Sequence, residues 1–323
     1  MTDHQQVPHP RDAHGPHESP HVREPRHPRE LCHPHESRRP HDPRDERSSP
    51  RPEEAERLAA EARQLQEQVF ELEVRVRARP KIALAEGILL ERYGLPDPDA
   101  AFALMRQASQ RANIKLHQVA VAVARMPGPA QGASLWFGER PQDPAPPLTV
   151  LGAGTLDVRN QGEVLGAALR RVLEITRTHM GNVQLVEDGT LRLERHIGLP
   201  REFTDHFAFV DGRTACSRAA DGGNQVTVKE VALSPGFDDV SRRVILSAGC
   251  RGVHSVPLVD DAKTVRGVIS SHHPHPLDGF DRTQLQAMHR TGRAVGRWID
   301  WHRRTVVLDA LEDLHQLALA RQE

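Results

Sequence analysis

Residues 79–126 read RPKIALAEGILLERYGLPDPDAAFALMRQASQRANIKLHQVAVAVARM and have the pattern of three short helices. Their apolar residues recur at helical spacing: Ile82, Ala85, Leu89 and Leu90; Ala101, Leu104, Met105 and Ala108; Leu116, Val119, Ala120 and Val123. Gly94 is placed to end the first helix, and Asp97-Pro98-Asp99 to begin the second. Asn113 is expected to cap the third helix. The first half of the chain therefore predicts a compact helical bundle.

Charge distinguishes this bundle from the rest of the chain. Between Arg75 and Arg125 there are nine Lys or Arg residues against four Asp or Glu residues, although the whole chain has a net charge of −1. A compact basic helical unit favours nucleic-acid phosphate as a partner. A solvated helical surface would have the same charge, so charge alone leaves both interpretations open.

The same segment resembles the ANTAR domain, an RNA-binding module of bacterial transcription antitermination regulators. The resemblance rests on Ala85-x-Gly87, on Ala101-Phe102-x-Leu104-Met105 and on Asn113-x-Lys115-Leu116-x-x-Val119-Ala120. It implies recognition of hairpin loops in leader RNA, with small residues where the helices pack closely. Exposed basic and polar side chains would contact the RNA; the candidates are Arg79, Lys81, Arg92, Arg111, Asn113, Lys115 and His117.

Two further segments precede the bundle. Residues 1–52 are rich in His, Pro and Arg and have few large apolar residues, which predicts a disordered tail. Residues 53–78 have a heptad pattern that predicts a short coiled coil and hence a homodimer; its core positions are Leu58, Ala62, Leu65, Val69, Leu72 and Val76. Packing of this stripe on the chain's own bundle is the alternative.

The composition places the protein in the cytoplasm. No apolar run is long enough to cross a bilayer, and there is no signal-peptide core near Met1. The chain has three cysteines, Cys32, Cys216 and Cys250. This small odd number and their wide spacing argue against a disulfide framework. Residues 127–156, rich in Pro and Gly, have the pattern of a linker, in which Trp136 and Phe137 are expected to dock on a neighbouring domain.

Residues 157–303 have the pattern of an α+β domain with an antiparallel sheet. An amphipathic helix is expected over 164–175, and Asp188-Gly189 lies between two alternating runs, as in a hairpin. Further elements are expected as helices at 201–209, 214–220 and 240–248, a strand at 226–228, and a hairpin of 253–259 with 265–271. A single long helix is expected over 281–321, so that residues 304–323 form a C-terminal helix. Its apolar stripe consists of Val307, Leu311, Leu314 and Ala318.

This region resembles a GAF domain. The matching pieces are NVQLVEDGTLRLERHIGLPREF, DGRTACSRA, AGCRGVHSVPLV and RGVISSHH, and they are most similar to the GAF domains that accompany ANTAR domains in actinobacterial regulators. The resemblance implies either a small-molecule or redox sensor module, whose ligand is unknown, or a dimer scaffold. It also implies that the C-terminal helix pairs across a dimer. The order of RNA module first and sensor second is the reverse of the family's commoner arrangement.

Candidate sites in the sensor region are few. Cys216 and Cys250 are candidates for redox or ligand sensing, Cys216 because a helix N-terminus would favour its thiolate; buried core cysteines are the alternative. His272-His273-x-His275 follows a strand and is interpreted as a loop, not as a metal site. No catalytic residues and no metal ligands are assigned, because no catalytic motif is present.

The sequence thus predicts a multidomain protein: a short coiled coil, an all-α three-helix ANTAR bundle over residues 79–126, and an α+β GAF domain. Its predicted function is RNA-binding transcription antitermination under GAF control, without enzymatic activity. The alternative is a GAF-type small-molecule or redox sensor in which the helical module only dimerises. DNA binding by the last two helices as a helix-turn-helix is a third hypothesis.

Overall fold

The computed structural model describes most of the chain after residue 78. The described residues are 79–138, 140, 143–152, 154–210 and 214–321, with 54, 56, 57 and 61 as single helical positions. The tail predicted for residues 1–52, Cys32 included, lies outside the described residues. So does the coiled coil predicted for residues 53–78, apart from those four positions.

Three helices follow one another in the predicted ANTAR segment: residues 79–93, α2 (Pro98–Ala112) and α3 (Leu116–Arg125). Gly94 follows the first helix with a φ of 58°, the left-handed conformation that glycine adopts readily. Asp97 caps α2 by accepting a hydrogen bond from the backbone N–H of Ala100 at 2.8 Å. The predicted helix stop and restart are therefore confirmed.

The prediction for Asn113 is wrong in its detail. Asn113 ends α2 as its C-cap in the left-handed conformation (φ 52°, ψ 42°), and Lys115 occupies the N-cap position of α3. Asparagine tolerates left-handed geometry better than other residues with a side chain, so it can close a helix where glycine is absent. The turn between α2 and α3 is consequently tight, and Asn113 and Lys115 lie on it.

The α+β class predicted for the C-terminal region is confirmed by a six-stranded antiparallel sheet of order β3-β2-β1-β6-β5-β4. Its strands are β1 (Met180–Glu187), β2 (Thr190–Ile197), β3 (Phe209–Val210), β4 (Val226–Val228), β5 (Gly252–Val259) and β6 (Val265–His273). Asp188 (φ 53°) and Gly189 (φ 82°) form the two-residue turn between β1 and β2. Positive φ at both positions matches the right-handed twist of the strands, which is why Asp-Gly predicted this hairpin.

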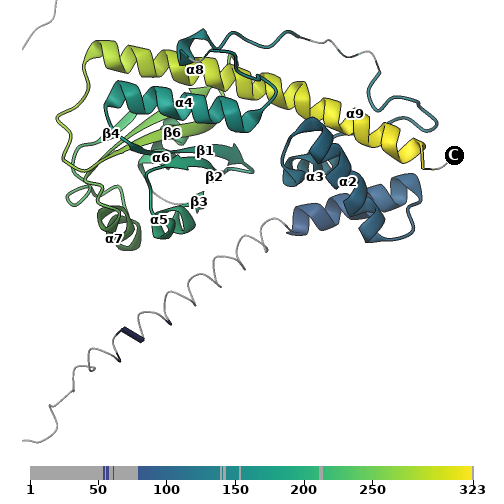
Figure 1. Ribbon diagram of the computed structural model, residues 1–323, viewed down its shortest axis with the longest axis horizontal. Helices are drawn as coiled ribbons and strands as arrows, with labels where there is room; N and C mark the ends of the chain where they lie inside the picture. Colours follow the sequence, from purple (N-terminus) through teal and green to yellow (C-terminus); the bar gives the residue numbers. More distant parts are fainter. Residues whose placement is uncertain are drawn as a thin grey trace, which may run out of the picture. The chain divides into compact units, whose positions relative to one another are not determined.

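Helices cover both faces of the sheet. α4 (Gln161–Thr176) and α8 (Arg282–Arg304) lie side by side on one face (Figure 1), where Val183, Val256 and Ile269 join their apolar residues. α6 (Ala215–Gly222) packs on the other face. The remaining short helices are η1 (Thr149–Leu151), α5 (Arg201–His206) and α7 (Asp239–Ser247).

Two glycines allow α8 to lie directly against β5. A Cβ atom on Gly292 would lie 2.4 Å from the carbonyl oxygen of Pro257, and one on Gly296 would lie 2.4 Å from backbone atoms of Val259. Neither neighbour is a flexible side chain that could move aside. Close packing of α8 on the sheet therefore depends on both positions lacking a side chain.

The sequence misplaces some helix and strand ends. The helix expected over 201–209 ends at His206, and Phe209–Val210 pairs with β2 as the short strand β3. The strand expected to end at Ser271 extends to His273. Among the described helices, none combines the length and apolar composition that a bilayer-spanning helix requires.

The single helix expected over 281–321 is divided in two. α8 ends at Arg304, and α9 (Val306–Leu319) begins after Thr305, whose ψ of −72° departs from regular helix geometry. α9 packs on α2 and α3 of the same chain, and its stripe of Val307, Leu311, Leu314 and Ala318 is buried there. Within the described chain this stripe therefore joins the core of the helical bundle, where a dimer contact had been expected.

The linker also packs on the bundle. Trp136 is buried, its indole N–H donates to the carbonyl of Pro127 at 2.9 Å, and its backbone N–H donates to Glu312 of α9. The Arg92 guanidinium lies over the indole ring, 4.7 Å from its centroid. The docking expected for Trp136 is confirmed, and it joins α9 to the first helix of the bundle.

Candidate nucleic-acid interface

Four of the seven predicted RNA-contact residues form ion pairs with the C-terminal region. Lys81 Nζ lies 2.5 Å from Asp188, Arg111 lies 3.0 Å from Asp313 of α9, and Lys115 pairs with Glu194. His117 Nε2 lies 2.9 Å from Glu187. Arg125, which sequence analysis did not select, also pairs with Asp188. We call Lys81, Arg111, Lys115 and Arg125 the basic face, and Glu187, Asp188 and Glu194 the hairpin acids.

The β1–β2 hairpin supplies these acids because of its local geometry. Glu187 ends β1, Asp188 forms the turn, and Glu194 lies within β2. The tight two-residue turn thereby presents three carboxylates to the helical bundle from a single hairpin. Lys81, Lys115 and Arg125 of the basic face are thereby paired with carboxylates of the same chain.

The remaining predicted contacts have different surroundings. Arg79 is exposed, whereas Arg92 lies on Trp136 with its Nη1 atom buried. Asn113 lines a cavity of about 550 Å³ together with Lys115, Glu194 and Arg195. His117 is only 8 % exposed, so in this arrangement a nucleic acid cannot reach it.

The pair of His117 and Glu187 is the most enclosed of these contacts. Arg192 also contacts the His117 Nε2 atom and lies 3.5 Å from Glu187. Burial of Glu187 opposes its ionisation, but the hydrogen bond to His117 and the charges of His117, Arg192 and Lys81 outweigh it. Together they lower the pKa of the Glu187 carboxyl to about 2. Glu187 therefore stays ionised over the whole physiological range.

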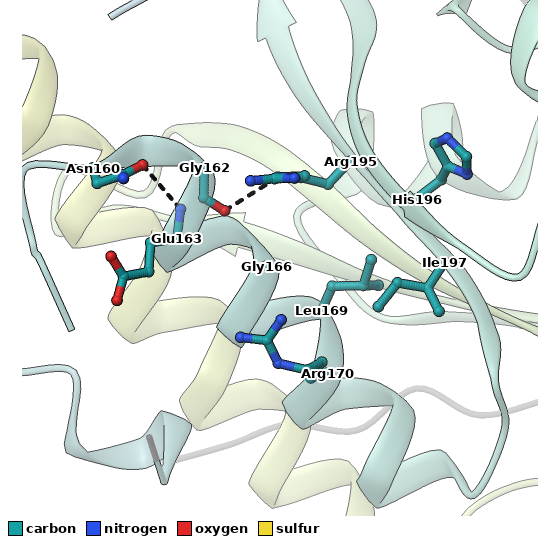
Figure 2. A pocket seen from close by; sticks show the side chains of 9 residues that line it. All are labelled: Asn160, Gly162, Glu163, Gly166, Leu169, Arg170, Arg195, His196 and Ile197. Carbon is teal, nitrogen blue, oxygen red and sulfur yellow. Dashed lines mark hydrogen bonds between the residues drawn. The ribbon is translucent and has the colours of Figure 1, made fainter. Parts of the chain in front are cut away.

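A second cavity of about 370 Å³ adjoins the first and lies between α4 and β2 (Figure 2). Arg195 Nε donates to the carbonyl of Gly162 at 3.1 Å, and Asn160 caps α4 by accepting from the N–H of Glu163 at 3.1 Å. Arg170 and His196 also line it. Because Arg195 lines both cavities, a polar surface extends from the turn between α2 and α3 onto the sheet domain.

The two sensor-region cysteines are free thiols; Cys250 is buried and Cys216 is partly buried. Cys216 lies in the first turn of α6, as predicted, and its Sγ lies 3.1 Å from the Ser270 hydroxyl. Burial nevertheless raises the pKa of the Cys216 thiol, and burial raises that of Cys250 to about 11. Both thiols are thus held protonated at neutral pH, which disfavours the redox-sensing thiolate that the helix N-terminus suggested.

A small cavity lies beside Cys216 in the face of the sheet covered by α6. Its volume is about 20 Å³, and Asn182, Gln184 and His272 contribute polar groups to its wall. The Oε1 atom of Gln184 and the Nδ1 atom of His272 are buried without hydrogen-bond partners among the described residues. The volume and the two unpaired groups match one buried water molecule, not an organic ligand.

His272 and His273 are core residues, contrary to the loop interpretation. His272 Nε2 lies 2.9 Å from Asn182 Oδ1, and His273 Nε2 lies 3.1 Å from the Ser271 hydroxyl; His275 is exposed. Sequence analysis also missed a group formed by His117, Glu187 and Glu194, whose ligand atoms all lie within 4.8 Å of one another. Because 69 residues separate His117 from Glu187, no spacing motif could have indicated it.

Residues 71–123 match the ANTAR domain family. The C-terminal region is similar to the solved GAF domain/HD domain protein from Geobacter sulfurreducens (16% identity, 48% of this chain, 94% of that chain, TM-score 0.37). It is also similar to a GAF domain from an Acinetobacter phosphoenolpyruvate-protein phosphotransferase (12%, 47% and 87%, 0.37).

A third similar structure is free methionine-R-sulfoxide reductase from Neisseria meningitidis (18% identity, 47% of this chain, 95% of that chain, TM-score 0.33). Among curated proteins, none matches the sequence. The chain therefore contains an ANTAR domain, followed by an α+β domain that has GAF domains among its structural neighbours.

Proposed function

We propose that this protein is a cytoplasmic RNA-binding regulator of transcription antitermination, in which the GAF-like domain controls access to the ANTAR domain. The observation that supports this proposal is the pairing of the basic face with carboxylates of the β1–β2 hairpin and α9. The side chains suited to phosphate are held by acids of the neighbouring domain. The described arrangement is then a closed state, and RNA binding requires these pairs to separate.

The strength of the pairs suits an exchangeable contact. The side chains of Arg111 and Arg125 are 53% and 61% exposed, and exposed ion pairs contribute about 0.2–1 kcal/mol each. RNA phosphates bring several negative charges together and release counterions on binding, so they can compete with single carboxylates. A signal in the GAF-like domain would shift this competition only if it binds the closed and open states with different affinity.

Neutralising the acids should strengthen RNA binding. We expect Asp188→Asn combined with Asp313→Asn to raise the affinity for a leader-RNA stem-loop by about threefold to about a hundredfold at low salt, given about 0.2–1 kcal/mol for each of the three exposed pairs that are lost. Three cations, Lys81, Arg111 and Arg125, lose their carboxylate partners in this variant. The logarithm of the binding constant should then fall more steeply with the logarithm of salt concentration, by about 0.7 for each cation that gains a phosphate.

Fluorescence anisotropy with a labelled stem-loop at several salt concentrations measures both quantities. The matched control is Asp239→Asn combined with Asp261→Asn, which removes the same charge from the pairs with Arg242 and Arg293, far from the ANTAR domain in the sequence. It should bind RNA as the wild type does. Equal gains in both variants would indicate a general charge effect. If neither the wild type nor any variant binds stem-loop RNA more tightly than RNA without a loop, the RNA-binding proposal is wrong.

The role we propose is regulatory and not catalytic. The raised pKa values of Cys216 and Cys250 support this role, because reductase chemistry at cysteine needs an accessible thiolate. We also propose a homodimer formed through residues 53–78, based on the heptad pattern alone. Sedimentation equilibrium of the full chain tests the dimer, and a monomer at micromolar concentration would exclude it.

A further inference from the structure

A group of metal-binding side chains lies where the helical bundle meets the sheet domain. His117 comes from α3, Glu187 from the end of β1 and Glu194 from β2. One ligand atom from each lies within 4.8 Å of the other two. The side chains of His117 and Glu194 are 9% and 2% exposed, so the group is enclosed by protein.

Glu194 carries a second observation that points to a ligand. Its Oε2 atom pairs with Lys115 and lies 3.5 Å from Gln161 Nε2. Its Oε1 atom is buried and has no hydrogen-bond partner among the described residues. An ionised carboxylate oxygen in an enclosed site is strongly unfavourable without a donor or a cation. A metal ion would satisfy this oxygen.

The chemistry of the donors limits the identity of the ion. One imidazole nitrogen with two carboxylate oxygens suits Zn²⁺ and similar first-row divalent ions, whereas Ca²⁺ and Mg²⁺ prefer all-oxygen sites with more ligands. Metal–ligand bonds of about 2.0–2.2 Å place ligand atoms about 3.4 Å apart in a tetrahedral site. His117 Nε2 and Glu187 Oε1 are 2.9 Å apart and would separate by about 0.5 Å. The ligand atoms all lie within 4.8 Å of one another, so the widest pair would approach by at most about 1.4 Å.

Two cations now lie beside the group, and metal binding requires each to give up one contact with it. Lys115 pairs with Glu194 through a side chain that is 47% exposed, and a lysine of that exposure can turn into solvent. Arg192, which contacts the His117 Nε2 atom, also lies 3.5 Å from the other oxygen of Glu187. A divalent ion would supply the positive charge that Lys115 now gives to Glu194. Arg192 can keep its pair with the other oxygen of Glu187 after giving up the His117 nitrogen.

We propose that His117, Glu187 and Glu194 form a three-ligand site for Zn²⁺ or a similar first-row divalent ion, with water completing the coordination. Two ligands belong to the GAF-like domain and one to the ANTAR domain, so the ion would link the two domains. This inference does not depend on RNA binding.

Thermal unfolding of the full chain, freed of metal with a chelator and titrated with Zn²⁺, tests the site. A ligand that binds the folded state and not the unfolded state stabilises the folded state by RT ln(1 + L/Kd), where L is the free ligand concentration. We therefore expect the Tm of the wild type to rise by several degrees with Zn²⁺. Glu194→Gln and His117→Gln should lose most of the rise. Co²⁺ in place of Zn²⁺ should give a visible absorption band in the wild type that both variants lack.

The controls separate this site from other zinc-binding groups. Residues 1–52 contain nine histidines, and every variant keeps them, so their zinc uptake cancels in the comparison. Glu163→Gln combined with His196→Gln removes the same residue types from the neighbouring cavity (Figure 2) and should behave as the wild type. If Glu194→Gln does not fold, Glu194→Asp keeps the charge opposite Lys115 and should reduce the zinc-dependent rise.

An absent Zn²⁺-dependent rise in the wild type would overturn the proposal. An equal rise in the wild type, His117→Gln and the Glu194 variants would also overturn it, because the stabilising ion would then lie elsewhere. The proposed RNA function can fail while this site stands, since neither the titration nor the Co²⁺ spectrum involves RNA.

Discussion

The folded protein is expected to be several kcal/mol less stable at pH 5 than at pH 7.5. Four of the buried histidines have lowered pKa values: His254, His272, His273 and His302. Burial lowers the pKa of His272 to about 3 and those of the other three to about 4, and for His254 and His272 the neighbouring His273 adds to the effect. In the unfolded chain each histidine has a pKa of about 6.5.

The sign of the effect follows from proton uptake. Below pH 6.5 the unfolded chain binds protons that the folded chain cannot accept until about pH 4, so stability is lost as the pH falls through this window. Each group contributes about 1.4 kcal/mol per pH unit once it is well below 6.5, which is about 2 kcal/mol at pH 5. The lowered pKa of Glu187 stabilises the folded state at higher pH, and this effect is lost only below about pH 4.5. Glu187 therefore does not contribute to the change between pH 7.5 and pH 5.

Urea unfolding followed by circular dichroism at pH 7.5, 6 and 5 measures this loss. His302→Gln can keep a donor for the Arg159 carbonyl, which lies 3.2 Å from His302 Nε2, and should reduce the pH dependence by about one histidine's share. His179→Gln, which removes an exposed histidine, should leave it unchanged. Unfolding free energies that agree at pH 7.5 and 5 would contradict the assignment of neutral buried histidines.

Local signals in the sequence predicted most elements. Two residue pairs, Asp97-Pro98 and Asp188-Gly189, favour a specific backbone conformation without help from tertiary contacts. The start of α2 and the β1–β2 hairpin could therefore be placed correctly. The end of β6 could not, because Pro274 and two adjacent histidines favour a loop in isolation. Burial of His272 against Asn182 is a tertiary contact that no local pattern encodes.

The candidate interface was predicted only in part. The sequence indicated which side chains are basic, but not that Glu187, Asp188 and Glu194 meet them, since each pair joins residues far apart in the chain. The heptad-like stripe of α9 was recognised, yet periodicity does not specify what covers an apolar face. The tertiary fold covers it with α2 and α3.

Through its position, α9 connects the GAF-like domain to the ANTAR domain. The order of the two domains along the sequence did not indicate how they could be coupled. α8 packs on β5 and β6, and α9 follows it after one residue and packs on the bundle. Glu312 and Asp313 of α9 bind the Trp136 backbone and Arg111. A displacement of α8 on the sheet would therefore act on the ANTAR helices through α9, whatever the chain order.

Removing apolar volume from α9 should weaken this connection. Leu314 is fully buried in the core that α9 shares with α2 and α3, and Leu→Ala substitutions at such positions cost about 2–5 kcal/mol. We expect Leu314→Ala to lower the unfolding free energy by that amount in urea titrations at pH 7.5. Leu317→Ala, at a partly buried position of the same helix, is the matched control and should cost less.

The same substitution should affect RNA binding if α9 holds the bundle closed. A looser α9 weakens the pair between Arg111 and Asp313, so Leu314→Ala should raise stem-loop affinity in the same direction as neutralising Asp188 and Asp313. Combining Leu314→Ala with those neutral variants should give less than the product of the separate gains, because both act on one closed state. Independent gains would mean that α9 supports the fold without linking the domains. A Leu314→Ala cost no larger than that of Leu317→Ala would contradict the packing of Leu314 in the shared core.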